Sequence, residues 1–72
     1  MAVSYKKLFH LLIEKDMTNA QLMEQAGFSA NIITRLKRNE YVSMESLGNI
    51  CRVMNCGVDD ILEFIYKEET ED

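Results

Sequence analysis

The sequence predicts an all-α protein, a compact five-helix bundle that contains a helix-turn-helix unit. Three observations predict this fold class. The 72-residue chain has no proline, it has few runs of β-branched residues, and its apolar residues recur with helical spacing. A chain of this length forms one domain with a small core. We expect that domain to span residues 1–66 and an acidic, solvated tail to span residues 67–72.

The first helix is expected from about Ser4 to Lys15, with Ser4 as its N-cap. Its inner face is formed by residues with i, i+3, i+4 spacing, namely Leu8, Leu11 and Leu12.

The second helix is expected over residues 19–26. Thr18 and Gln21 have the spacing of a capping box, in which each side chain bonds the other residue's backbone N–H. Gly27 is expected to end the helix, because glycine adopts the left-handed conformation without steric cost.

The third helix is expected to follow an N-cap at Ser29 and to end near Arg38, where Asn39 suits a left-handed position. Two helices joined by a tight glycine turn meet at a steep angle, as in a helix-turn-helix unit.

The fourth helix is expected after Ser43 and is closed by Asn55. Its inner face has i, i+3, i+4, i+7 spacing and consists of Leu47, Ile50, Cys51 and Met54.

A fifth helix is expected from Gly57 or Val58. Asp59 and Asp60 suit the positive end of its dipole. The residues expected to face inward from this helix are Ile61, Leu62 and Ile65.

Charge is distributed unevenly along this chain, whose net charge is −4. Residues 1–58 hold seven Lys/Arg and five Asp/Glu, whereas residues 59–72 hold one Lys and seven Asp/Glu. Three of the basic residues, Arg35, Lys37 and Arg38, lie on the third helix. The low overall pI therefore does not exclude nucleic acid as a partner.

The third helix has two chemically distinct sides. Ile33 and Leu36 are expected to face the bundle, and the opposite side consists of Ala30, Asn31, Thr34, Arg35 and Arg38, with Lys37 at its edge. A helix fits the major groove of B-DNA, where Asn can bond adenine, Arg can bond guanine, and Ala or Thr can contact a thymine methyl group. Taken alone, this pattern also fits the solvated side of a surface helix.

Phosphate contacts are expected from three residues at the end of the third helix, Lys37, Arg38 and Asn39. Asn19 can add a contact at the start of the second helix, where the N-terminus attracts anions.

From about Leu8 to Leu62 the chain resembles the Cro/repressor-type helix-turn-helix family, also called the xenobiotic-response-element type. The matching segments are TNAQLMEQAGFSANIITRLKRN, SMESLGNIC and VDDIL. This resemblance implies a lambda-repressor-like DNA-binding domain, transcriptional regulation, commonly as a dimer, and base reading by the third helix.

The family's base-contacting positions correspond to Ala30, Asn31, Thr34 and Arg35. Its phosphate-contacting positions correspond to Thr18, Asn19, Ser29, Arg38 and Asn39.

The chain departs from the family pattern at several positions. Met23 stands where alanine is usual, and Glu40 stands where a basic residue is common. Leu12 and Lys37 occupy positions at which the family often has an arginine–glutamate pair. We expect Met23 to set the second and third helices slightly further apart and Glu40 to weaken the attraction for phosphate. We interpret the loss of the arginine–glutamate pair as compatible with DNA binding.

Other classes of function have little support in the sequence. Cys51 and Cys56 lack the further ligands of a zinc site, and His10 has no catalytic partner at a suggestive spacing. We expect both cysteines to lie in the core and His10 on the surface. No cofactor, metal site, enzymatic activity or membrane span is expected, and the start MAVSYKK lacks a signal region, so we expect a cytoplasmic protein.

Two partners are expected: double-stranded DNA and a second copy of the chain. Phe64 and Tyr66 are left over when the inner face of the fifth helix is assigned, which suggests a homodimer through that helix. In one alternative, Phe64 folds back on Val58 or the first helix. In another, the whole chain is a protein-interaction module that kept the fold and lost DNA binding.

Overall fold

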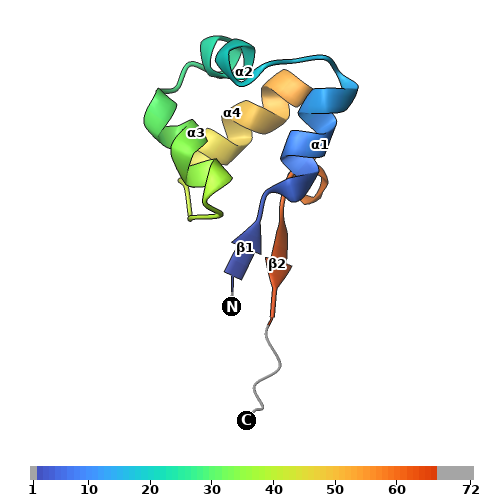
Figure 1. Cartoon of the computed structure of the whole chain (residues 1–72), viewed down its shortest axis with the longest axis vertical. Helices are drawn as coiled ribbons and strands as arrows, with labels where there is room; N and C mark the ends of the chain where they lie inside the picture. Colours follow the sequence, from blue (N-terminus) through green and yellow to red (C-terminus); the bar gives the residue numbers. More distant parts are fainter. Residues whose placement is uncertain (1, 67–72) are drawn as a thin grey trace.

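The computed structural model describes residues 2–66 of the chain. Its elements, in chain order, are β1 (Ala2–Ser4), α1 (Lys6–Glu14), α2 (Asn19–Ala26), α3 (Ala30–Lys37), α4 (Met44–Met54), the 3-10 turn η1 (Val58–Asp60) and β2 (Glu63–Ile65). The helices form a rounded body, and the two short strands extend from it as a ribbon (Figure 1). The expected tail over residues 67–72 lies outside the described residues.

The helices α2, α3 and α4 are placed as the sequence predicts. The capping box at the start of α2 is present: the Thr18 hydroxyl accepts from the Gln21 N–H at 3.1 Å, and Gln21 Oε1 accepts from the Thr18 N–H at 2.9 Å. Ser43 caps α4 by accepting from the Ser46 N–H at 3.1 Å, and Asn55 ends α4 in the left-handed conformation. Local signals therefore define the central helices.

The prediction of a fifth helix is wrong. Residues 58–60 form one 3-10 turn, and residues 63–65 form a strand, so the described chain has four α-helices. Ile61 and Leu62 are buried as predicted, but Ile65 is 44% exposed rather than inward-facing. The physical reason is long-range pairing, because the β-branched and aromatic side chains of this segment suit a strand once a partner strand is available.

The partner strand is the start of the chain, which the sequence analysis assigned to the first helix. Ala2 pairs with Ile65, Val3 with Phe64 and Ser4 with Glu63, in antiparallel register. The helix α1 therefore begins at Lys6, two residues later than expected, and Tyr5 takes the N-cap position. The Ser4 hydroxyl accepts from the Lys6 N–H at 3.3 Å, so Ser4 bonds the start of α1 from within β1.

One apolar core joins the helical body to the ribbon. It includes the inner faces of all four helices together with Val3, Tyr5, Ile61 and Leu62. Cys51 and Cys56 are only partly buried and pack against this core rather than lying fully within it. Among residues 2–66, no helix is long and apolar enough to cross a bilayer.

Candidate nucleic-acid interface

A left-handed glycine sets the angle between α2 and α3. Gly27 has φ +78°, and its N–H donates to the Met23 carbonyl at 2.8 Å. Open space surrounds the position of a missing Cβ, so the backbone conformation, not crowding, favours glycine here. Ser29 then starts α3 with extended backbone, although within the described residues its hydroxyl makes no capping bond. The turn is the predicted one, and the Ser29 side chain is left available.

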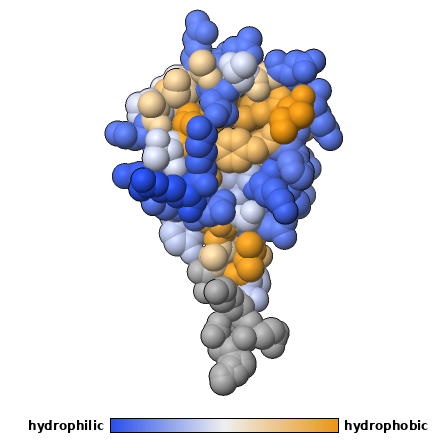
Figure 2. Space-filling view, in the orientation of Figure 1, coloured by the Kyte–Doolittle hydropathy of each residue, from blue (hydrophilic) through white to orange (hydrophobic). Residues whose placement is uncertain are grey.

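The structure separates the two sides of α3 as the sequence predicts. Ile33 is 6% exposed and Leu36 is fully buried. The four candidate base-contacting residues are all exposed on the helix: Ala30, Asn31, Thr34 and Arg35. Space-filling colours show strongly hydrophilic residues gathered over the side of the molecule where α3 lies (Figure 2). This exposed row is available to a partner without any rearrangement of the core.

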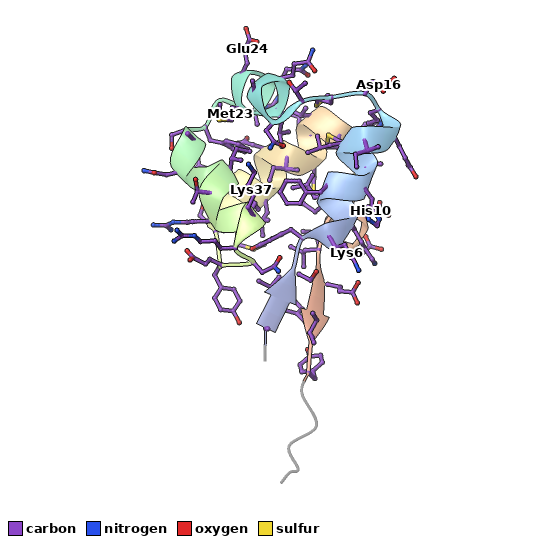
Figure 3. The ribbon with its side chains drawn as sticks, viewed as in Figure 1. Lys6, His10, Asp16, Met23, Glu24 and Lys37 are labelled. Atoms are coloured by element: carbon purple, nitrogen blue, oxygen red, sulfur yellow. The ribbon has the colours of Figure 1, made fainter. Side chains whose placement is uncertain are left out.

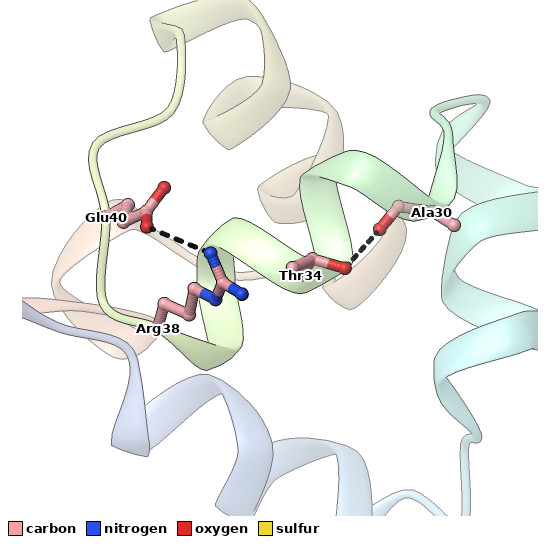
Figure 4. Close-up of polar contacts among 4 residues, drawn as sticks. All are labelled: Ala30, Thr34, Arg38 and Glu40. Carbon is pink, nitrogen blue, oxygen red and sulfur yellow. Dashed lines mark hydrogen bonds and ion pairs between the residues drawn. The ribbon is translucent and has the colours of Figure 1, made fainter.

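The hydroxyl of Thr34 is used inside α3. It donates to the Ala30 carbonyl at 3.2 Å (Figure 4). Its donor capacity is therefore satisfied, and what it can offer a partner is an acceptor oxygen and a methyl group. A methyl group matches the thymine contact that the sequence predicts for this position.

The candidate phosphate-contacting residues at the end of α3 have different surroundings. Arg38 forms an exposed ion pair with Glu40, with 3.8 Å between Nη1 and Oε2 (Figure 4). Such an exposed pair is weak and screened by salt. Within residues 2–66, it is the one ion pair that the chain forms, so Arg35 and Lys37 face solvent without an acidic partner. Asn39 has φ +58°, as predicted, and its Oδ1 accepts from the Tyr5 N–H at 3.0 Å, which leaves its amide nitrogen for other contacts.

At the start of α2, the two candidate phosphate contacts also differ. The Thr18 hydroxyl is held in the capping box, whereas Asn19 is the first residue of the helix and is half-buried. The N-terminus of a helix presents unpaired backbone N–H groups, which attract anions. The structure brings this terminus and α3 into one helix-turn-helix unit.

A shallow groove between α1 and α3 extends the basic surface beyond the predicted residues. It has a volume of about 480 Å³, and its lining includes Lys6 and His10 from α1 and Lys37 from α3. These three side chains are labelled in Figure 3. His10 is exposed, as predicted. Lys6 was not singled out from the sequence, because its place opposite α3 depends on tertiary packing.

Tyr5 is the residue near this surface that the sequence analysis missed. It is 1% exposed, its N–H donates to Asn39, and its hydroxyl donates to the Glu40 carbonyl at 2.7 Å. Burial raises the pKa of the Tyr5 hydroxyl, an effect that the nearby Val42 backbone partly offsets. A buried tyrosine usually needs a polar partner, but the sequence gives no sign that this partner lies 35 residues away.

The two candidate dimer residues lie at the ribbon rather than on a helix. Phe64 is 49% exposed within β2, and Tyr66, just after that strand, is 71% exposed. Hydrophobic surface is visible at this end of the molecule (Figure 2). Among residues 2–66, each strand has one hydrogen-bonded neighbour, so each also has an open edge.

Within residues 2–66, no group of three or more metal-binding side chains is present. The two cysteines are free, and burial raises the pKa of the Cys56 thiol, with a further contribution from neighbouring Cys51. A raised thiol pKa lowers the fraction of reactive thiolate.

Comparisons with known proteins agree with this geometry. The family model of the Cro/C1-type HTH DNA-binding domain matches residues 7–67. A crystal structure of the transcriptional regulator VanUg is similar to this chain, with 44% sequence identity and a TM-score of 0.82. The match covers 86% of this chain and 83% of that one. The search of curated proteins gave no match.

Proposed function

Because the chain belongs to the Cro/C1-type helix-turn-helix DNA-binding family, we propose that it is a cytoplasmic, sequence-specific regulator of transcription that reads the major groove with α3. The observation that carries this proposal is the exposed row on α3, Ala30, Asn31, Thr34 and Arg35, opposite a buried row that fixes the helix to the core.

The proposed base contacts follow from the chemistry of these side chains. Asn31 and Arg35 are one helical turn apart, and each can form two hydrogen bonds with one base. Ala30 and the methyl group of Thr34 are suited to thymine methyl groups. Asn31 and Arg35 would therefore contribute most of the sequence selectivity.

The proposed phosphate contacts surround this row. Lys37 and Arg38 supply charge at the end of α3, and Asn39 supplies its amide nitrogen. On the other side, the contacts come from Thr18, Asn19 and Ser29 near the α2–α3 turn. Contacts of this kind fix the protein on the duplex without reading its sequence.

We further propose that the DNA-binding form is a homodimer joined at the β1–β2 ribbon. The half-exposed Phe64 and the exposed Tyr66 lie beside an open strand edge, and aromatic side chains are enriched at protein interfaces. A second copy could present the same surface to the first, as in a two-fold dimer. Two symmetric α3 helices would then read half-sites about 34 Å apart.

The test of base reading starts from selection of bound sequences out of random duplex DNA. On the selected site, Arg35→Ala is expected to lose about 1–3 kcal/mol of binding free energy and to relax one base position. Arg38→Ala serves as the matched control and should weaken binding to all sequences about equally. Equal losses across sequences for both variants would overturn the assignment, and no duplex binding by the wild type would favour a protein-interaction module instead.

The dimer has its own test in sedimentation at micromolar concentration. The wild type should sediment as a dimer and Phe64→Glu as a monomer, because a charge would be placed in an apolar interface. Ile13→Glu is the control, since Ile13 is 73% exposed near the C-terminal end of α1, whereas the ribbon joins α1 at its N-terminal end. A monomeric wild type that binds single half-sites as tightly as palindromic sites would contradict the dimer.

A further inference from the structure

The end of α3 is built as a particular kind of helix cap. The Asn39 N–H donates to the Leu36 carbonyl at 3.1 Å, and the Glu40 N–H donates to the Arg35 carbonyl at 2.9 Å. With Asn39 in the left-handed conformation, these two bonds form a Schellman motif. The cap therefore includes the carbonyl of Arg35, one of the proposed base-reading residues.

Tyr5 holds both residues of this cap from outside the helix. Its backbone N–H donates to Asn39 Oδ1 at 3.0 Å, and its hydroxyl donates to the Glu40 carbonyl at 2.7 Å. Asn39 and Glu40 are separated from Tyr5 by 34 and 35 positions in the sequence. The two bonds thus attach the end of α3 to a distant part of the chain.

That distant part is the junction between the ribbon and α1. Tyr5 follows β1 directly, occupies the N-cap of α1, and is 1% exposed. A buried tyrosine ring has few accessible rotamers, so its hydroxyl is held in one place. The end of α3 is thereby fixed relative to both α1 and the ribbon.

We propose that Tyr5 is a positioning residue for DNA reading, which holds the C-terminal end of α3 at the angle that base contacts require. This inference rests on the proposed function. Two-bond contacts with base edges depend steeply on geometry, whereas a lysine or arginine attracts phosphates over a range of positions. Loss of the Tyr5 tether should therefore weaken binding to the preferred site more than binding to random DNA.

The direct test is Tyr5→Phe, which removes the bond to Glu40 and keeps the buried ring. Binding to the preferred duplex and to random duplex is measured at one salt concentration, at a temperature where circular dichroism shows every variant folded. We expect affinity for the preferred duplex to fall by about three- to tenfold, the worth of one hydrogen bond. Affinity for random duplex should change by less than about twofold, because phosphate contacts tolerate small shifts.

Two controls separate positioning from a general loss of structure. Ser46→Ala removes a buried hydroxyl that bonds the Ser43 hydroxyl at 3.1 Å at the start of α4, and Ile50→Val removes one methyl group from a fully buried core position. Both should keep the wild-type ratio of specific to random affinity. If Ile50→Val lowers this ratio as much as Tyr5→Phe does, the ratio follows stability and the positioning role is overturned.

The outcomes also distinguish this inference from the proposed function. A wild type that does not discriminate between the preferred duplex and random DNA overturns the proposed function, and the positioning role fails with it. A wild type that discriminates, together with a Tyr5→Phe variant that keeps the full ratio, overturns the positioning role alone. Faster hydrogen exchange at the Asn39 and Glu40 amides of the free Tyr5→Phe protein is the expected structural signature of the lost tether, and unchanged exchange would contradict it.

Discussion

The α2–α3 unit and the β1–β2 ribbon are held together by different kinds of interaction. In the former, bonds between near neighbours define each end, such as those of Thr18 with Gln21 and of Gly27 with Met23. In the latter, Val3 pairs with Phe64 from the opposite end of the described chain. The α2–α3 unit is therefore built from local signals, whereas its attachment to the ribbon depends on long-range contacts.

Loss of a buried side chain from α3 should change stability most. Leu36 is fully buried, so Leu36→Ala should lower the free energy of unfolding by about 2–5 kcal/mol, the usual cost of such a cavity. Phe64→Ala, at a half-exposed ribbon position, is the matched change and should cost much less in the monomer. Urea unfolding at low protein concentration measures both, and comparable losses would contradict the division into a packed helical body and an exposed ribbon.

The two N-caps of the helix-turn-helix unit should contribute unequally to the free energy of unfolding. Thr18→Ala should cost about 1 kcal/mol of unfolding free energy, because it removes a capping bond. Ser29→Ala should cost clearly less, because among the described residues the Ser29 hydroxyl makes no such bond. Thermal unfolding of the two variants measures both losses of stability. A larger loss for Ser29→Ala would mean that its hydroxyl does cap α3.

Alkaline pH should weaken the connection between the two regions. Burial raises the pKa of Tyr5 above its usual 10.0, so the folded state retains the hydroxyl proton more strongly than the unfolded state. The resulting stabilisation is present below pH 10.0 and is lost as the pH rises through the folded-state pKa. Tyr5→Phe should therefore lose less unfolding free energy than the wild type between neutral and alkaline pH. The raised pKa of Cys56 affects both proteins alike, so equal losses would contradict this role for Tyr5.

The acidic residue Glu40, just after α3, should affect stability least. Glu40→Gln removes the 3.8 Å ion pair with Arg38 and should leave unfolding free energy nearly unchanged, since exposed pairs contribute about 0–1 kcal/mol. DNA affinity should rise modestly, because Arg38 becomes free to contact phosphate and a repulsive charge is lost. Glu24→Gln, at an exposed position on α2, is the control for net charge alone. An equal rise in both variants would show that Glu40 has no local role.

The sequence predicted the locally determined helix ends correctly and failed where the structure depends on contacts between distant residues. Thr18, Gly27 and Asn55 have recognisable patterns within three or four residues, and the structure confirms each in its predicted role. The prediction of a fifth helix was wrong because a short apolar segment can form a helix or a strand, depending on what it packs against. Here its partner is the strand at the start of the chain. Tyr5 was missed for the same reason, since its hydrogen-bond partners become neighbours only when the chain is folded.

The candidate site was predictable to a similar degree. Helical periodicity separated the exposed row of α3 from Ile33 and Leu36, and the structure confirms that separation. The ion pair of Arg38 with Glu40 and the commitment of Asn39 Oδ1 to Tyr5 depend on how the α3–α4 loop folds. The assignment of individual residues to base contacts or to phosphate contacts stays a prediction.

Docking of α3 on duplex DNA, with Lys37 and Arg38 on phosphates, should make binding depend on salt. Affinity of the wild type for its selected duplex is measured over a range of salt concentrations, beside Arg38→Ala. The log of the association constant should fall linearly with log salt, with a slope of roughly −0.9 for each phosphate neutralised. Arg38→Ala should make that slope shallower by about one. An affinity independent of salt would contradict DNA binding through phosphate contacts, and an unchanged slope in Arg38→Ala would contradict the contact assigned to Arg38.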